Sequence, residues 1–393
     1  MNLKQMQLKV RFKRFKSLKV KTDKNTQAFF ALLRAGLWER GEVYLNLNDK
    51  VDWENVYQLA EEQSVVGLVL AGIERLKNAS YNLNLDQELL LQWIGEVQII
   101  EQQNKDMNVF VAKLVEKLRR EDVYAILVKG QGVAQCYERP LWRLSGDVDL
   151  LLTEYNYKKA QNFLVPLASS TEEEDPIEKH LGLVIDNWSV ELHGTQRSRC
   201  LMKMDKVIDE AQRDVFYGGN VRSWLNGRTQ IFLPGIDNDV VFVFTHIIKH
   251  FFRGGIGLRQ VCDWCRLLWT YSDKLDLKLL ESRLKSAKLM SEWKTFAYMA
   301  VNTLGMPENA MPFYSSADKW KNKSNKILEI IIKTGSFGHK IDKSYLSKYG
   351  PVKRKLTTMW RGTIENTAHF PIFPLDSIRV WFNLIRKGIL RVK

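Results

Sequence analysis

The chain has 393 residues, of which 45% are hydrophobic and 26% charged, and this balance predicts a folded protein with a large core and two or three domains. No run of eighteen apolar residues occurs, and the first residues lack the compact apolar segment of a secretory signal, so we expect a cytoplasmic protein with no transmembrane segment. Four cysteines in so long a chain are typical of buried thiols and argue against a disulfide framework.

The formal net charge of +14 is concentrated at the two ends of the chain. Residues 1–22 contain eight lysines and arginines and no acid, and residues 377–393 contain five and no acid. Basic ends favour contact with a polyanion, which could be a nucleic acid or an anionic membrane surface. For residues 1–22, a solvated terminus without a partner is the competing interpretation.

The first part of the chain is predicted to be helical. Apolar residues recur at helical spacing over residues 26–40, and Gly41 follows as a stop. Residues 52–120 continue the helical pattern, with Asp52 as a candidate cap at their start. The pattern then changes, because residues 123–128 are β-branched and apolar and predict a strand. A short helix and a second strand, DVDLLL, are expected to follow it.

A strand hairpin and a long helical region complete the prediction. After a helix near residues 155–166, the runs LGLVID and WSVELH predict two strands joined by a tight turn at Asp186 and Asn187. From Asp237 onward the pattern is helical again, over several segments. The last segment, SIRVWFNLIRKGILRVK, predicts a basic amphipathic helix that either rests on a membrane surface or docks on the protein's own helices.

Asp147 and Asp149 lie one residue apart at the start of the second predicted strand. Alternate side chains of a strand share a face, so the two carboxylates project together and repel each other unless a cation offsets their charge. Mg²⁺ prefers oxygen ligands and shares its remaining positions with water and substrate phosphates. The pair therefore predicts a magnesium site for a nucleoside triphosphate, with exposed structural aspartates as the alternative.

The residues around this pair strengthen the prediction. Lys129 and Gly130 follow the first strand and begin the short helix, where a lysine and backbone N–H groups could contact phosphates. Glu191, in the hairpin, is a third acid that could bind metal or act as a base. Arg143 could bind the triphosphate or pair with an aspartate. His193 shares the face of Glu191 and could be a base, a partner of a metal ligand or a structural histidine.

The order of these motifs resembles the nucleotidyltransferase superfamily typified by DNA polymerase β. The stretch LVKGQGVAQCYERPLWRLSGDVDLLL, with the later ELH, more closely resembles a bacterial nucleotidyltransferase family, at Lys129, Gly130, Tyr137, Arg143, Asp147, Asp149, Glu191 and His193. Further matches in the helical region are His246, His250, Leu258, Arg259 and Asp263. The resemblance spans about residues 25–300. It implies that Asp147 and Asp149 ligate Mg²⁺ and that Glu191 is the third acid. Separately from the resemblance, His193 and His250 are predicted to face the cleft and to contact the nucleotide.

The phosphate turn departs from the pattern of the wider superfamily. That superfamily carries a Gly-Ser pair there, whereas this chain has Gly130, Gln131 and Gly132, so a hydroxyl contact is lost. A non-catalytic nucleotide-binding protein with a degenerate site is therefore one alternative. The chain also resembles the nucleotidyltransferase toxins of abortive-infection systems, and an enzyme that modifies RNA is another.

A zinc site is a further hypothesis for the helical region. His246 and His250 precede Cys262 and Cys265, and all four are residue types that zinc accepts. Each pair is spaced to share one face of a helix. Zinc modules usually draw their cysteines from turns, however, and these cysteines fall in an apolar helical run, so buried thiols are the favoured interpretation.

Together these patterns predict an α+β protein whose polymerase-β-like core, a small mixed sheet with helices, is flanked by N-terminal and C-terminal helical domains. The expected regions are a basic tail (1–24), a helical region (25–120), the nucleotidyltransferase core (121–235), a helical domain (236–310) and a basic helical region (311–393). The predicted activity is Mg²⁺-dependent transfer of a nucleoside monophosphate from an NTP to an acceptor hydroxyl, with release of pyrophosphate. The acceptor could be a small molecule, a glycan or RNA.

Overall fold

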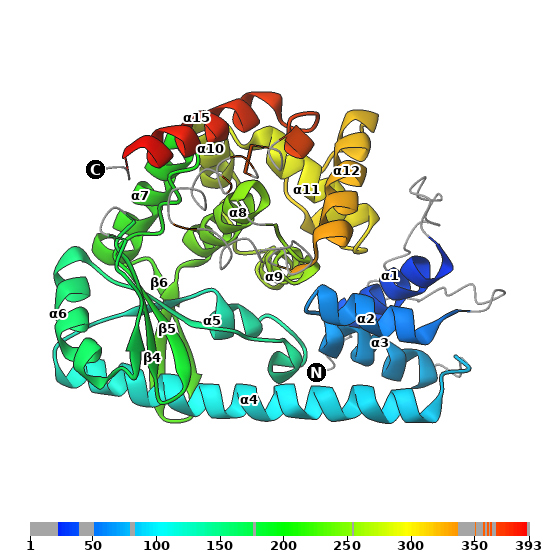
Figure 1. Ribbon diagram of the computed structural model, residues 1–393, viewed down its shortest axis with the longest axis horizontal. Coiled ribbons are helices and arrows are strands. Elements are labelled where there is room, and N and C mark those ends of the chain that lie inside the picture. The colour runs from blue at the N-terminus through cyan, green and yellow to red at the C-terminus, as the bar shows by residue number, and fades with distance from the viewer. Residues whose placement is uncertain are drawn as a thin grey trace, which may run out of the picture.

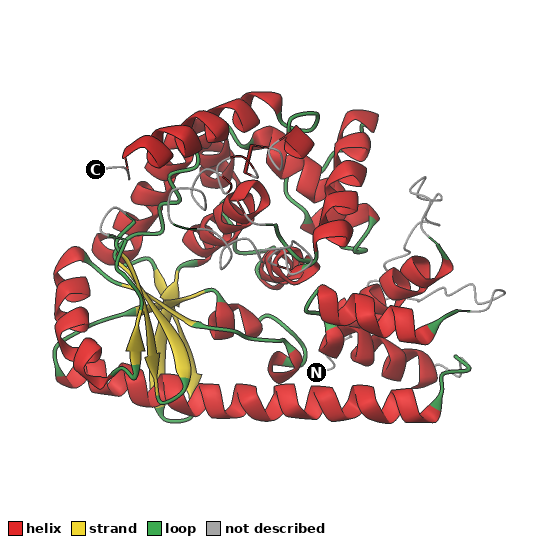
Figure 2. Ribbon diagram, in the orientation of Figure 1, coloured by secondary structure: helices red, strands yellow, loops and turns green. Residues whose placement is uncertain are grey.

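The computed structural model describes residues 23–38, 51–78, 83–175, 178–253, 255–336, 350, 357, 360, 362–363 and 367–390. Helices surround a sheet that occupies one part of the molecule (Figure 2). The expected α+β class with a small mixed sheet is confirmed. The basic segment 1–22 lies outside the described residues, as do the side chains that follow residue 383.

Four helices form the first part of the fold, as the apolar spacing predicts. They are α1 (Lys24–Leu37), α2 (Trp53–Glu62), α3 (Val66–Asn78) and α4 (Gln87–Arg120). The predicted cap is confirmed, since the Asp52 carboxylate accepts a hydrogen bond from the backbone N–H of Asn55. The first helix ends at Leu37, earlier than expected, and Gly41 lies outside the described residues.

Helix α4 joins the two halves of the molecule (Figure 1). Its 34 residues correspond to a length of about 50 Å at 1.5 Å per residue. Trp93 and Val97, near its start, are buried in one core cluster with α1, α2 and α3. Val111 and Leu118, near its end, belong to a second cluster beneath the sheet. Both cores therefore depend on one continuous apolar stripe.

The main sheet has five strands in the order β1-β2-β5-β4-β3. The strands are β1 (Ile126–Val128), β2 (Val148–Leu151), β3 (Ser170–Thr171), β4 (His180–Ile185) and β5 (Trp188–His193). Only β2 and β5 run parallel, and the other pairs are antiparallel. The predicted hairpin turn is confirmed, since Asp186 and Asn187 have φ values of 50° and 67°. The short elements between these strands are α5 (Gly130–Ala134), η1 (Pro140–Trp142), α6 (Glu154–Leu164) and η2 (Val165–Leu167).

Three elements after the sheet have no counterpart in the sequence prediction. They are α7 (Met202–Tyr217) and a hairpin of β6 (Val221–Asn226) and β7 (Thr229–Pro234). The hairpin turns at Gly227, whose φ of 62° suits glycine, and Asn226 precedes it. An Asn-Gly dipeptide between alternating apolar residues is a strong hairpin signal, so this element could have been predicted.

The remaining elements are helical, as expected. They are α8 (Ile236–Arg253), α9 (Leu258–Thr270), α10 (Leu277–Ala287), α11 (Met290–Asn302), η3 (Glu308–Ala310), α12 (Asp318–Thr334) and α15 (Pro374–Leu390). Helix α15 docks on the protein through Val380, and Asn383 donates a hydrogen bond to the Cys200 carbonyl. Docking is thus confirmed for this part of the helix. Among the described helices, none has both the length and the apolar character that a membrane span requires.

Strand alternation decides which side chains the sheet presents to each side. Val148 and Leu150 of β2 and Leu192 of β5 point into the core shared with α4 and α6. The alternate residues, including Asp149 and Glu191, project from the opposite face. This second face carries the polar cluster described next.

Candidate active site

The turn after β1 has an unusual backbone. Lys129 and Gly130 both have positive φ, at 58° and 36°. A positive φ is costly for lysine, and such strain is concentrated at functional sites. At Gly130, a Cβ atom would lie 3.4 Å from the backbone oxygen of Asp147. The turn therefore runs close to the loop that precedes β2.

Three carboxylates meet beside this turn. Asp149 of β2 pairs in register with Glu191 of β5, and Asp147 lies just before β2. One oxygen from each of the three lies within 4.8 Å of the others. The short parallel pair of strands thus gathers the three acids that the sequence predicted to act together.

The aspartates differ in their surroundings. Asp149 is buried, and its Oδ1 accepts Lys129 Nζ at 2.7 Å and contacts His193 Nε2 at 2.7 Å. Burial opposes the charge of Asp149, but Lys129 and His193 outweigh this effect and lower its pKa. The negative charge of Asp149, then burial, raises the pKa of Asp147 to about 6. Asp147 therefore bears most of the repulsion within the cluster.

Two histidines contact the third acid. Glu191 Oε2 lies 3.1 Å from His180 Nε2 and 3.3 Å from His193 Nε2. Burial opposes the charge of Glu191, but these contacts outweigh it and lower its pKa. The hydrogen bond to Glu191 raises the pKa of His180. His180, His193 and Lys129 therefore all lie beside the acidic cluster.

A small pocket adjoins the cluster. Its lining includes Lys129 and His193 from the sheet side and Thr245, His246 and Lys249 from α8. Helix α8 therefore faces Lys129 and His193 across this pocket.

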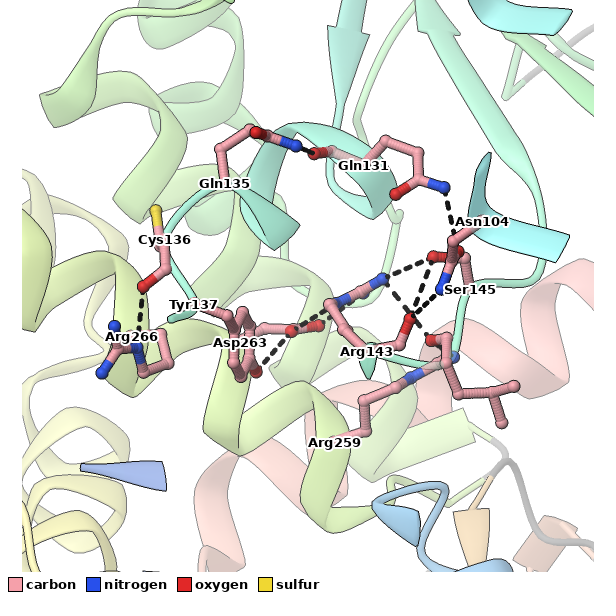
Figure 3. Close-up of polar contacts among 11 residues, drawn as sticks. Asn104, Gln131, Gln135, Cys136, Tyr137, Arg143, Ser145, Arg259, Asp263 and Arg266 are labelled. Carbon is pink, nitrogen blue, oxygen red and sulfur yellow. Dashed lines mark hydrogen bonds and ion pairs between the residues drawn. The ribbon is translucent and has the colours of Figure 1, made fainter. Parts of the chain in front are cut away.

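A buried ion pair holds the loop before β2. Arg143 donates from Nε to Oδ1 of Asp263 and from Nη2 to Oδ2, both at 2.7 Å. Tyr137 donates a hydrogen bond of 2.8 Å to the same carboxylate, and Ser145 accepts one of 3.2 Å from Arg143 (Figure 3). Arg259, one helical turn before Asp263 on α9, donates to the backbone oxygen of Leu144 at 2.6 Å. Helix α9 thus fixes the segment that leads into Asp147.

A second set of contacts ties the same loop to α4. Asn104 donates hydrogen bonds to the backbone oxygens of Leu141 and Arg143, at 2.7 and 2.8 Å. Gln131 donates to the Asn104 side-chain oxygen at 3.0 Å and is buried (Figure 3). Gln131, the second residue of α5, is therefore engaged with α4.

The comparisons with known proteins agree with this geometry. A family model described as an uncharacterised nucleotidyltransferase matches residues 49–305. The chain belongs to this family. Neither the search of the curated proteins nor that of the solved structures gave a match. The chain is accordingly a nucleotidyltransferase, and the acidic cluster that could hold a metal supports this activity.

Two further residues, Arg143 and His250, were predicted to contact the nucleotide, and the structure places them in different surroundings. Arg143 is held by Asp263, which raises its pKa against the effect of burial, so the structure favours the pairing alternative. His250 lies on α8 with its ring centroid 4.3 Å from that of His246. Burial, then Lys249 and Lys129, lowers the pKa of His250 to about 3.

The zinc hypothesis finds no support in the described part of the chain. Cys262 and Cys265 are buried free thiols on α9, and burial raises the pKa of both. The two residue groups that could hold a metal there are His180, Glu191 and His193, and Asp147, Asp149 and Glu191.

The sequence prediction missed two residues of this region. His180 pairs in register with His193, at equal distances from the Asp186–Asn187 turn, so the predicted hairpin already implied that the two lie together. Lys249 follows His246 by three residues on α8, a spacing that places them on one helix face.

Proposed function

We propose that this nucleotidyltransferase uses Mg²⁺ to transfer a nucleoside monophosphate from an NTP to an acceptor hydroxyl. The acceptor oxygen forms a bond to the α-phosphorus, the bond to the bridging oxygen breaks, and pyrophosphate leaves. The observation that carries this proposal is the convergence of Asp147, Asp149 and Glu191 beside the Lys129 turn.

The donor set fits Mg²⁺. All three groups offer carboxylate oxygens, which hard divalent cations prefer. The raised pKa of Asp147, about 6, reflects repulsion that a cation would relieve. Asp149 uses Oδ1 for Lys129 and His193, so its second oxygen could serve a metal. When bound, Mg²⁺ would offset the charge of the triphosphate.

The chain's own residues then have separate proposed roles. Lys129, whose pKa the three carboxylates raise against burial, stays charged and could move from Asp149 to a phosphate oxygen. Glu191 would bind metal or take the proton of the acceptor hydroxyl. We assign Arg143 a positioning role, because it fixes the loop before Asp147 through Asp263. The proposal keeps His193 and His250 as nucleotide contacts.

We propose further that the fold is that of the polymerase-β-like superfamily, that the protein is bacterial and that it works in the cytoplasm. The chain order of the motifs, from the Lys129–Gly130 turn through Asp147 and Asp149 to Glu191, supports the superfamily. The basic segments at both ends would contact an acidic surface.

A transfer assay tests the proposed reaction. Full-length protein would be incubated with each NTP, Mg²⁺ and acceptor fractions of small molecules, glycans or RNA, and pyrophosphate release would be measured. We expect release with at least one fraction, and a loss of at least about 100-fold in Asp147→Asn. Equal release from Asp147→Asn would contradict the assigned site.

A second candidate function is nucleotide binding without turnover. The burial of Gln131 against Asn104 favours it, because the turn then lacks the hydroxyl that the wider superfamily places near the phosphates. Binding of an NTP with no pyrophosphate release in any fraction would favour this candidate over catalysis.

A further inference from the structure

Three metal-type ligand atoms converge on the outer side of the acidic cluster. The Nε2 atoms of His180 and His193 lie 3.1 and 3.3 Å from one oxygen, Oε2 of Glu191. The three ligand atoms all lie within 4.8 Å of one another. The pairing of β4 with β5 creates this arrangement, since His180 stands directly opposite His193.

The spacing of these atoms fits a shared ion. Metal–ligand bonds of about 2.1 Å place neighbouring ligands roughly 3.0 Å apart in an octahedron and roughly 3.4 Å apart in a tetrahedron. The two nitrogen–oxygen distances fall within this interval. Two imidazoles and one carboxylate are also the ligand set of many transition-metal sites that keep an open position for water or substrate.

We propose that His180, His193 and Glu191 form a binding site for a divalent first-row transition ion. Imidazole nitrogen suits such ions, whereas Mg²⁺ requires oxygen. The site is therefore chemically distinct from the proposed Mg²⁺ site, with which it shares only Glu191. Because of this shared residue, an ion bound here would lie next to the Mg²⁺ site. Its binding does not depend on nucleotidyl transfer.

Access and charge are compatible with the proposed site. The side chains of His180 and Glu191 are 30% and 29% exposed, so an ion could enter, while His193 is buried and held in place. His180 and His193 also line the pocket that faces α8, which leaves room for water on the ion. His193 Nε2 also contacts Asp149, at 2.7 Å.

Titration of the metal-free, full-length protein with Co²⁺ tests the proposal, because imidazole ligation gives visible d–d absorption. We expect saturable binding of one equivalent and competition by Zn²⁺. Mutating a residue that only hydrogen-bonds to a metal ligand lowers metal affinity by about 10- to 100-fold. His180 is itself a proposed ligand, so His180→Asn should lower the Co²⁺ affinity on the order of 100-fold. Circular dichroism would establish that this variant folds, and His180→Gln is a second variant for the same position.

Two control variants separate this site from its neighbours. His246→Gln on α8 should leave the Co²⁺ spectrum unchanged. If this variant lost the spectrum, the ion would lie on α8 and the proposal would be overturned. Asp147→Asn should keep Co²⁺ binding while losing Mg²⁺-dependent NTP binding. If the wild-type protein bound Co²⁺ but turned over no nucleotide, this result would contradict the proposed function and leave the metal site intact. Absence of saturable Co²⁺ binding to the wild type, or wild-type affinity in both His180 variants, would overturn the metal site alone.

Discussion

The pair of Arg143 and Asp263 is the residue contact on which the position of Asp147 most depends. Both side chains are nearly inaccessible, at 6% and 9% exposure, and they share two hydrogen bonds. Removing one member of a buried pair leaves a charge without solvent or partner, which costs about 3–5 kcal/mol. This contact joins segments 120 residues apart, so no local sequence pattern could have specified it.

We therefore expect Asp263→Asn to lower the free energy of unfolding by about 3–5 kcal/mol, measured by urea denaturation. Glu281→Gln is the matched control, because Glu281 forms an exposed i,i+4 pair with Lys285. That control should change stability by no more than about 0.5 kcal/mol. A change below about 1 kcal/mol in Asp263→Asn would show that the pair does not hold the loop.

Glu292 on α11 should make stability depend on pH. Burial, then the neighbouring Asp376 of α15, raises the pKa of Glu292 to about 8. The folded state thus holds a proton that the unfolded state, with an ordinary glutamate pKa near 4.3, has already lost at neutral pH. This contribution is complete below about pH 4 and is lost as pH rises towards 8.

Replacement of Glu292 by glutamine removes the group whose protonation makes stability depend on pH. Relative to the wild type, Glu292→Gln should gain stability as pH rises from 6 to 9, which thermal melting at several pH values would measure. An unchanged difference between the two proteins across this range would exclude a raised pKa at Glu292.

At the level of elements, glycines set the crossing of α1 and α3. A Cβ atom at Gly36 would lie 1.8 Å from the backbone oxygen of Leu68, and one at Gly72 would lie 2.1 Å from that of Leu32. These are contacts with helix backbone, which cannot rotate away. The two helices can approach this closely only because both positions lack a side chain.

Gly36→Ala should consequently destabilise the protein by about 1–3 kcal/mol or more in chemical denaturation, because overpacking forces the helices apart. Gly95→Ala on α4 is the contrasting variant, since a Cβ there meets nothing within 4 Å. Alanine is the better helix former, so this change should stabilise by about 0.5–1 kcal/mol. Similar effects from both substitutions would contradict the close packing of α1 on α3.

Helices and strands could largely be predicted where their signal lies within one segment of the sequence. Apolar spacing predicted α1 to α4 and α8 to α11, and turn chemistry at Asp186 and Asn187 predicted the β4–β5 hairpin. The β6–β7 hairpin was missed although its Asn226–Gly227 turn is a local signal. The order of the strands, with β5 between β2 and β4, depends on long-range pairing that the sequence pattern does not contain.

In the whole molecule, the N-terminal helices and the later helical region share one core. Trp38 donates a hydrogen bond to the Leu304 backbone oxygen at 2.6 Å, and Gln63 donates one to that of Ile331 at 3.1 Å. Buried residues of α1 and α11 belong to the same cluster. The five-region division of the chain stays a prediction, and these contacts show that residues 25–120 do not stand alone.

The site was predictable only where a local sequence pattern brings its residues together. The D-x-D spacing places Asp147 and Asp149 together without knowledge of the fold, and the hairpin register implies the meeting of His180 with His193. Glu191 reaches the aspartates only because β5 pairs with β2, and the resemblance to nucleotidyltransferases supplied this link. The anchoring of the loop by α9 and α4 became visible only in three dimensions.

Calorimetric titration of Mg²⁺ and NTP into the wild type and Asp149→Asn tests the central claim most directly, since it requires no knowledge of the acceptor. Asp149 is buried between Lys129 and His193, and the asparagine keeps its shape while removing its charge. We predict Mg²⁺-dependent binding of at least one NTP to the wild type and a loss of at least about tenfold in affinity in the variant. Binding of equal affinity in both proteins, or no binding of any NTP to the wild type, would contradict a nucleotide site at these carboxylates.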